Sequence, residues 1–400
     1  MKFIQAKNNQ ISSYYHERPN SPTYLSVIIP AGTVHESTKK FGISHLIEHM
    51  ICRETDKYDS LQGLKAEIAK RGLYVNAHTS LDHTRLHIGI PMSEDFGFAI
   101  GLLTEMLYSP RYSSETIEIE KNAIRSEMAV LSSNPGRYIY SELYRKLFGL
   151  EVSDIPNYGN IKNLESFTDK DVDEQFAHIK SLPIIVLASG GVSLRDFQQG
   201  MASIPSINVD STSNDKVLEA VSSFASAEIE HGERLSVGYI YTSAIAGLDS
   251  LCAIDLLTEY LGNYMFGVLT QKLRDESGDS YYVDAGHSVY GENGYISIST
   301  DIKKSDKAQI NKVIFSEISR LADGEIDVDR LEIVREMLIK RSPVKLEQTS
   351  SEVIVNERLR SFIVNGGNDY SDYLDQLKGL DIDQIRKFAH QVFMPVDSND

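Results

Sequence analysis

Basic residues and long apolar runs are both scarce in this 400-residue chain, and each scarcity excludes a class of protein. The 57 Asp and Glu residues outnumber the 40 Lys and Arg residues, which gives a formal net charge of −17. A protein that binds nucleic acid needs a basic face to neutralise phosphates, so we expect no nucleic-acid partner. A membrane-spanning helix needs roughly 18 consecutive apolar residues. No window of the sequence approaches that length, so we expect no membrane partner.

The chain also contains little cysteine. Cys52 and Cys252 are its only two cysteines, and they lie in different halves of the sequence. Two well-separated thiols provide no disulfide framework and are typical of a reducing compartment. The opening residues have no apolar core after Lys2, so a secretory signal is not expected. Together these features predict a cytoplasmic protein.

Length and element order predict two domains. A chain of 400 residues is long for one hydrophobic core and favours two domains of about 200 residues each. In the first half, the apolar run 24–29 predicts a buried strand, and 73–79 with 84–90 predict a strand pair. The second half repeats this order, with a strand at 235–241 and a strand pair at 281–302. Helical patterns accompany these strands at 60–71, 114–131, 168–179, 250–261, 264–275, 305–322, 327–340 and 381–393.

The sequence between the halves is polar and rich in turn-forming residues, as in IPSINVDSTSN at 204–214. We therefore expect a first domain at residues 1–203, a linker at 204–222 and a homologous second domain at 223–400. The expected fold class is α+β, with two duplicated, sandwich-like domains in which helices cover a sheet.

The segment GISHLIEHM contains two histidines four residues apart, His45 and His49, with Glu48 between them. Residues four apart lie on one face of an α-helix, so both imidazoles can bind one metal ion. Glu48 flanks that face, from which it can reach a water on the metal rather than the metal itself. Zinc lowers the pKa of such a water, and a carboxylate can take its proton as the water attacks a peptide carbonyl. This inverted zinc-peptidase motif predicts a zinc metallopeptidase with Glu48 as the general base.

A third ligand would distinguish this interpretation from a solvated helix face that happens to carry two histidines. The helix expected at 114–131 offers several glutamates, among them Glu120 and Glu127. These two are seven residues apart and lie on one face, two turns from each other. One can bind the metal while the other holds a ligand or a water in place. Their spacing leaves open which one does which.

HLIEHM, followed further on by EKNAIRSEMAVLSSNP, resembles the pitrilysin and mitochondrial processing peptidase family of inverted-motif zinc peptidases. The resemblance covers nearly the whole chain, from about residue 24 to residue 393. It implies one zinc ion per chain, with Glu127 as the third ligand beside His45 and His49, and with Glu120 as a supporting acidic residue. The chain departs from the family after the helix that carries His45 and His49, where Glu54 replaces a glycine and brings a charge near the site. We expect Cys52 to serve packing there, with no catalytic part.

Two further segments resemble substrate-binding parts of the family. Asn76 and Ala77 in VNAHTS match the edge strand on which the family binds an extended peptide by β-augmentation. In LRDESGDSYYV, Arg274 and Tyr281 match an arginine and a tyrosine that hold the substrate backbone and stabilise the tetrahedral oxyanion. Without the resemblance, Asn76 and Ala77 would be a simple turn, Arg274 a helix-end cation and Tyr281 a strand aromatic.

The acidic charge of the chain serves solubility or, if it lines a cleft, attracts basic peptides.

The resemblance also implies an assembly. Family members enclose the substrate in a clamshell of four such domains, and this chain has two, so it corresponds to one half. We expect a homodimer, with a heterodimer that includes a metal-free homologue as the other possibility. The expected function is a zinc endopeptidase that cleaves peptides or short unstructured polypeptides. The alternatives are a peptidase dedicated to maturing one precursor peptide, a zinc hydrolase of other substrates, and a non-catalytic partner subunit.

Overall fold

The computed structural model of the chain describes residues 4–8, 11–151, 154–205, 219–245, 247–263, 265–290, 292–347 and 370–394. It divides into two compact units. The first unit contains the described residues up to Met128, those from 154 to 219 and those from 345 to 347. The second unit contains the described residues from 129 to 151, from 220 to 344 and from 370 to 394. Most of the linker expected at 204–222 falls at 206–218, outside the described residues.

The first unit is built on a six-stranded mixed sheet with the strand order β1-β2-β6-β3-β5-β4. Neighbouring strands are antiparallel except β2 and β6, which run parallel. The strand β3 is buried along its whole length, as its apolar sequence TYLSVII predicts, whereas β4 lies at an edge and pairs only with β5. The six strands are β1 (Ile4–Asn8), β2 (Ile11–Glu17), β3 (Thr23–Ile29), β4 (Tyr74–Thr79), β5 (Thr84–Ile90) and β6 (Ile184–Gly190).

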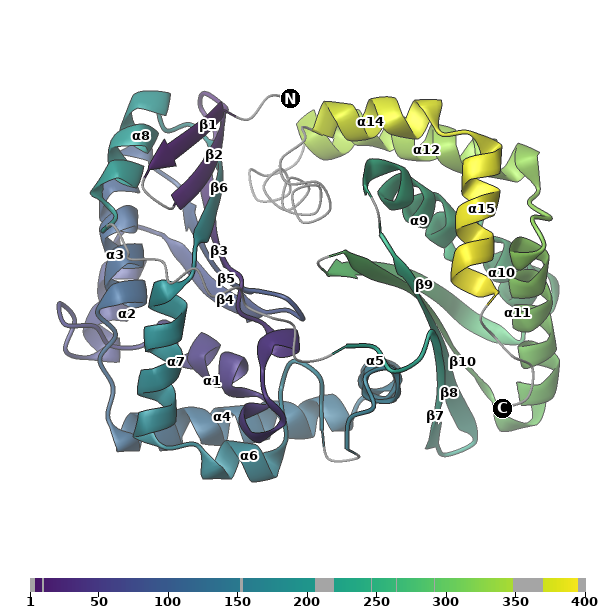
Figure 1. The fold of residues 1–400 in the computed structure, drawn as a ribbon, viewed down its shortest axis with the longest axis horizontal. Helices are drawn as coiled ribbons and strands as arrows, with labels where there is room; N and C mark the ends of the chain where they lie inside the picture. The colour runs from purple at the N-terminus through teal and green to yellow at the C-terminus, as the bar shows by residue number, and fades with distance from the viewer. Residues whose placement is uncertain are drawn as a thin grey trace. The chain divides into compact units, whose positions relative to one another are not determined.

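Helices cover one face of this sheet, as Figure 1 shows for the first unit. They are α1 (Ile43–Ile51), α2 (Leu61–Lys70), α3 (Phe96–Tyr108), α7 (Asp169–Ser181) and α8 (Leu194–Ser203). Two further helices, α4 (Ser114–Ser132) and α6 (Ile161–Ser166), pass below them in the same view. The start of α7 follows from its sequence, because Thr168 and Asp171 form a capping box that satisfies free N–H groups of the first turn.

The second unit is built on a four-stranded antiparallel sheet with the order β7-β8-β10-β9. Its strands are β7 (Phe224–His231), β8 (Arg234–Ala244), β9 (Ser280–Tyr290) and β10 (Asn293–Lys303). The remaining elements are α9 (Gly247–Gly262), α10 (Val268–Thr270), a π-helix (Gln271–Glu276), α11 (Lys307–Ala322), α12 (Val328–Glu347), α14 (Tyr370–Gly379) and α15 (Ile382–Phe393). The helix expected at 264–275 begins only at Val268, and it continues without a break from α10 into the π-helix.

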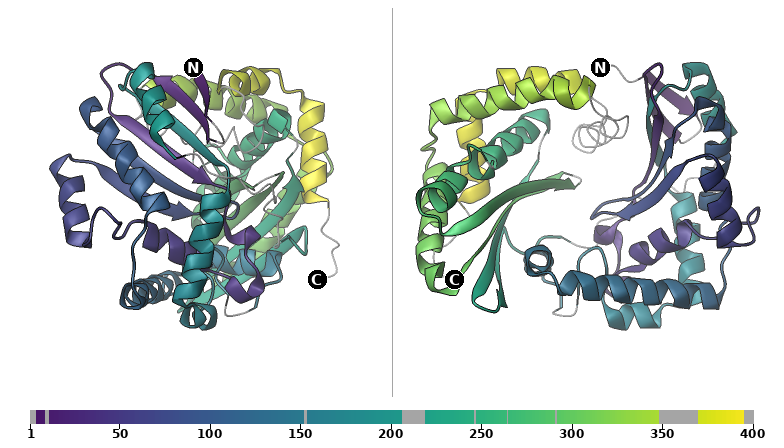
Figure 2. Two further views of the ribbon diagram at one scale, coloured as in Figure 1. Left: turned by 60° about the vertical axis from the view of Figure 1, so that its left-hand side comes forward. Right: turned by 180° about the vertical axis from the view of Figure 1, so that it is seen from behind.

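Helices lie on both faces of the second sheet (Figure 2). On one face, the Tyr241 ring packs against Phe393 of α15 with 5.1 Å between ring centres. On the other face lies α5 (Pro135–Leu147), which precedes the expected linker in sequence. A Cβ atom on Gly238 would lie only 2.8 Å from Ile139 of α5, so glycine is needed for this close approach. Residues 129–151 thus pack in the second unit, and two sheets covered by helices confirm the α+β class.

The sequence predicts neither a disulfide nor a membrane-spanning helix, and both predictions concern the described part of the chain. Cys52 and Cys252 are both free thiols, so no disulfide links them. Among the described helices, none combines the length and the apolar composition that crossing a membrane would require.

Candidate metal centre

The helix α1 begins at a buried carboxylate. Glu36, which is only 7% exposed, accepts hydrogen bonds from the backbone N–H of Gly42 (2.8 Å) and of Ser44 (2.7 Å). These groups belong to the first turn of α1 and have no partner within the helix. Burial raises the pKa of Glu36 to about 7, although both hydrogen bonds act in the opposite direction. Glu36 therefore fixes the start of the helix that carries His45, Glu48 and His49.

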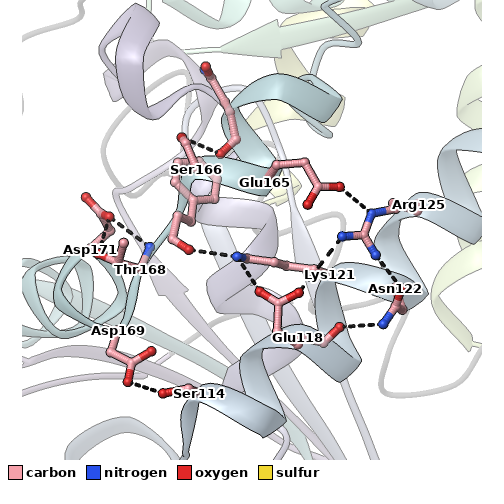
Figure 3. A network of polar contacts seen from close by, with 12 residues as sticks. Ser114, Glu118, Lys121, Asn122, Arg125, Glu165, Ser166, Thr168, Asp169 and Asp171 are labelled. Carbon is pink, nitrogen blue, oxygen red and sulfur yellow. Dashed lines mark hydrogen bonds and ion pairs between the residues drawn. The ribbon is translucent and has the colours of Figure 1, made fainter.

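The helix α4, which carries both candidate acidic ligands, is fixed by a polar network against α6 and the start of α7 (Figure 3). At its centre the buried ammonium of Lys121 donates to Glu118 Oε1 and to the carbonyl of Phe167, both at 2.7 Å. Arg125 pairs with Glu165 of α6 at 2.6 Å. A buried cation satisfied in this way cannot shift without losing strong charge-assisted hydrogen bonds. The network thereby sets the rotation of α4 about its axis.

Three side chains from α1 and α4 converge at one point. Glu127 Oε2 lies 3.6 Å from His45 Nε2 and 3.5 Å from His49 Nε2. One ligand atom from each of the three side chains lies within 4.8 Å of the others. In the part of the chain that the structure describes, this is the one group of three His, Cys, Asp or Glu side chains that could hold a metal ion.

Glu120 contacts the opposite side of the His49 ring. His49 Nδ1 lies 3.0 Å from Glu120 Oε2, and the other oxygen of Glu120 accepts from Arg53 Nη1 at 2.7 Å. A carboxylate at Nδ1 favours the tautomer in which Nδ1 carries the proton and the Nε2 lone pair is free to bind metal. Since Nε2 faces Glu127, Glu127 belongs to the group that could hold a metal ion, whereas Glu120 lies at the other nitrogen of the His49 ring.

The two histidines have opposite protonation behaviour in the metal-free site. Burial lowers the pKa of His45 to about 4, with the neighbouring charge of His49 acting in the same direction. Burial also lowers the pKa of His49, but the carboxylates of Glu120 and Glu127 outweigh it and raise this pKa to about 9. A metal would bind the neutral imidazole of His45 directly, whereas it would have to displace a proton from His49. Two imidazoles and one carboxylate form a donor set that zinc prefers, so these residues fit the expected ion.

Glu48 lies beside this group without contributing a ligand atom to it. Its half-buried carboxylate accepts hydrogen bonds from the side chain and the backbone of Thr79, the last residue of β4. Burial raises the pKa of Glu48 in spite of these hydrogen bonds. A carboxylate with a raised pKa is a better proton acceptor near neutral pH.

The other residues selected from the sequence lie on β4 and in the second unit. Asn76 is exposed on the edge strand β4, and Ala77 is buried at 6% exposure. Arg274 is exposed in the π-helix, and Tyr281 near the start of β9 is 82% exposed. The functions of these four residues stay predictions.

In the segment after α1, where the sequence departs from the family pattern, Glu54 forms an ion pair and accepts a backbone hydrogen bond. Arg53 Nε lies 3.2 Å from Glu54 Oε2, and Glu54 also accepts from the backbone N–H of Leu61 at 3.3 Å. Arg53 pairs with Glu120 as well, so it offsets the charge of Glu54 only in part. Burial raises the pKa of the Cys52 thiol to about 12, so it carries no thiolate at neutral pH and suits a packing role.

Four residues that no sequence motif indicates contact the metal group or the helices that carry it: Glu36, Arg53, Lys121 and Tyr158. Tyr158, for example, donates from its hydroxyl to Glu127 Oε1 at 3.3 Å. Of these four, only Arg53 could have been noticed in the sequence, because it lies in the segment after α1 that differs from the family pattern. The others lie in loops or act through contacts distant in sequence, for which helical spacing provides no pattern.

Two models of known protein families match this sequence, one in each half of the chain. A family model described as insulinase (peptidase family M16) matches residues 14–153, which contain the whole metal group. A second model, described as the peptidase M16 inactive domain, matches residues 204–338. The chain belongs to peptidase family M16. The resemblance seen in HLIEHM and in the segment around Glu127 is thereby confirmed.

The M16 relatives include bacterial proteins of similar length. The Bacillus subtilis protein named "Uncharacterized zinc protease YmxG" is 22% identical over 383 residues, which cover 94% of this chain and 92% of that protein. The human mitochondrial-processing peptidase subunit beta is 30% identical over 166 residues, which cover 41% of this chain but only 34% of that subunit. The crystal structure of a protease from Helicobacter pylori has a TM-score of 0.85 at 17% identity, covering 98% of this chain and 97% of that one. At 17% identity, this match shows that the two chains share a fold and nothing further.

Proposed function

We propose that this M16 protein is a zinc metalloendopeptidase in which His45, His49 and Glu127 bind one zinc ion. The observation that carries the proposal is the convergence of the three ligand atoms within 4.8 Å on two helices that are separately fixed. The network around Lys121 holds α4, and Glu36 holds the start of α1. A site held by its surroundings in this way is what efficient metal binding requires.

The chain's own residues have distinct parts in the proposed reaction. A zinc ion bound at this site would polarise the attacking water and the peptide carbonyl. Glu48 takes a proton from that water and later donates it to the leaving amine. Glu120 keeps His49 in the tautomer that leaves Nε2 free, and Arg53 holds Glu120 in turn.

The substrate that this site suits is an extended peptide. The edge strand β4 packs against α1, and its last residue, Thr79, is hydrogen-bonded to Glu48. A peptide that pairs with β4 would therefore run toward the proposed base, with Asn76 and Ala77 among the residues it contacts. This pairing requires an unfolded segment, which favours short unstructured polypeptides over folded proteins.

The proposed assembly is a homodimer in which Arg274 and Tyr281 act on the substrate held at the partner's metal centre. The family resemblance assigns these two residues to the substrate backbone, and two domains form half of the family's chamber. The mitochondrial relative is itself named as a subunit, which also favours an assembly of more than one chain. A heterodimer with a metal-free homologue is the competing arrangement.

The test combines metal analysis with cleavage of a mixed peptide library. The wild-type chain should contain one zinc ion and should cut unstructured peptides. Glu48→Gln should retain the zinc and lose turnover, because it removes the proton acceptor without removing a ligand. If Glu48→Gln lost zinc as completely as His45→Ala, Glu48 would be a ligand and the assigned roles would be wrong. A wild-type chain that binds zinc and cuts no peptide would instead favour the non-catalytic partner subunit.

A further inference from the structure

Tyr158 contacts two of the three side chains in the metal group, although it belongs to neither α1 nor α4. Its hydroxyl donates to Glu127 Oε1 at 3.3 Å. Its ring lies edge-on to the His45 ring, with 4.6 Å between the ring centres. Both contacts lie within the first unit.

The turn that carries Tyr158 is held tightly against the start of α1. Ile155 and Gly159 exchange backbone hydrogen bonds of 2.8 Å, which close the turn around Tyr158. Gly159 and Gly42 both have positive φ angles, and a Cβ atom on Gly159 would lie 2.6 Å from the Cα of Gly42. Only glycine permits two backbones to approach so closely. The position of Tyr158 is therefore fixed relative to the first turn of α1, where His45 lies.

Glu127 needs such a contact more than the two histidines do. Its side chain is 44% exposed, compared with 6% for His45 and 19% for His49. A half-exposed glutamate has several accessible rotamers, and binding a metal would cost the entropy of restricting it to one. The Tyr158 hydroxyl engages Oε1, while Oε2 is the oxygen that faces both imidazoles.

We propose that Tyr158 is a positioning residue of the metal centre, which holds Glu127 so that Oε2 faces His45 and His49. This role rests on the proposed function only in taking these three side chains as the zinc ligands. Tyr158 acts through Glu127 and does not itself bind the metal. Its effect should therefore appear in zinc affinity, measured without any substrate.

The test measures zinc affinity by competition with a chromophoric chelator in the otherwise intact chain. Tyr158→Phe removes only the hydroxyl and should weaken zinc binding by about tenfold, as is typical when a group that holds a ligand is lost. Tyr158→Leu also removes the ring against His45 and should weaken binding further. Tyr112→Phe is the matched control, because the Tyr112 hydroxyl donates to Asp173 in the same unit at 2.6 Å. This control should bind zinc like the wild type.

A double-mutant cycle tests whether Tyr158 acts through Glu127. In a Glu127→Ala background, Tyr158→Phe should cause little further loss of zinc affinity, because no carboxylate remains to be positioned. Fully additive losses would overturn this route of action, and so would a Tyr158→Phe chain with wild-type zinc affinity. A wild-type chain without zinc affinity would instead overturn the metal centre itself, together with the role given to Tyr158. Thermal unfolding of each metal-free variant verifies that the fold is retained.

Discussion

His49 and Glu120 are joined across α1 and α4, with 3.0 Å between Nδ1 and Oε2. Glu120 is itself held by Arg53, and the pKa of Glu120 is lowered because His49 and Arg53 outweigh the opposite effect of burial. An ionised carboxylate therefore lies behind the imidazole at neutral pH. This pair orients the His49 ring and, together with Glu127, raises the pKa of its imidazole.

We predict that zinc affinity keeps rising with pH up to about 9. The pKa of His49 is about 9 in the metal-free chain, so below that pH zinc binding must release one proton. The apparent affinity should therefore increase about tenfold per pH unit between roughly pH 7 and pH 8.5. Competition titrations across this range check the slope. In Glu120→Gln the pKa of His49 should fall, and the affinity should level off at a lower pH. Identical profiles for the two chains would show that Glu120 does not control this proton.

Replacing Glu120 and replacing Glu127 by glutamine should reduce zinc binding to different extents. Glu127→Gln removes a proposed ligand and should strip zinc from the purified chain. Glu120→Gln removes a group behind a ligand and should weaken zinc binding by about 10- to 100-fold without abolishing it. Metal analysis after dialysis against a weak chelator measures both. The reverse order of zinc loss would exchange the roles of Glu120 and Glu127.

The buried carboxyl of Glu36 should make the stability of the metal-free chain depend on pH. Its folded-state pKa is raised from 4.5 to about 7, so the folded chain binds this proton more tightly than the unfolded chain does. Its stabilising contribution is thus fully present below about pH 4.5 and is lost as the pH rises to about 7. The stability of the wild type relative to Glu36→Gln should fall by roughly 3 kcal/mol over this range.

Urea unfolding of both metal-free chains at pH 4.5, 6 and 8 measures this difference. Glu174→Gln is the control, because Glu174 forms an exposed ion pair with Lys40 and should have little effect at any of these pH values. A wild-type advantage that grows with pH would mean that the ionised form of Glu36 is the favoured one. The raised pKa would then be wrong.

Mixing two inactive chains tests the proposed homodimer. Glu48→Gln lacks the base, and Tyr281→Phe lacks the hydroxyl expected to stabilise the oxyanion. Random exchange should restore about a quarter of wild-type activity, because half of the dimers are mixed and each has one site with both groups intact. Subunit exchange is verified first with differently tagged chains. Mixed dimers that form and stay inactive would exclude action in trans and would favour a different partner chain.

The sequence alone determined the features that depend on local spacing. His45, Glu48 and His49 share one helix, and the helical period by itself brings the two imidazoles together. The helical pattern at 168–179 and the apolar run at 24–29 likewise predicted α7 and β3. The resemblance carried by HLIEHM added the family and the choice of Glu127, which spacing had left open against Glu120.

The tertiary structure decided which distant residues meet. The rotation of α4, set by the buried Lys121, directs Glu127 toward both Nε2 atoms and Glu120 toward Nδ1 of His49. The helix α5 has an apolar face in its sequence, but only packing assigns that face to the second sheet. Helix and strand periods fix which side chains of one element share a face. Which faces then meet depends on burial and close packing between segments far apart in the chain, and no local pattern records those contacts.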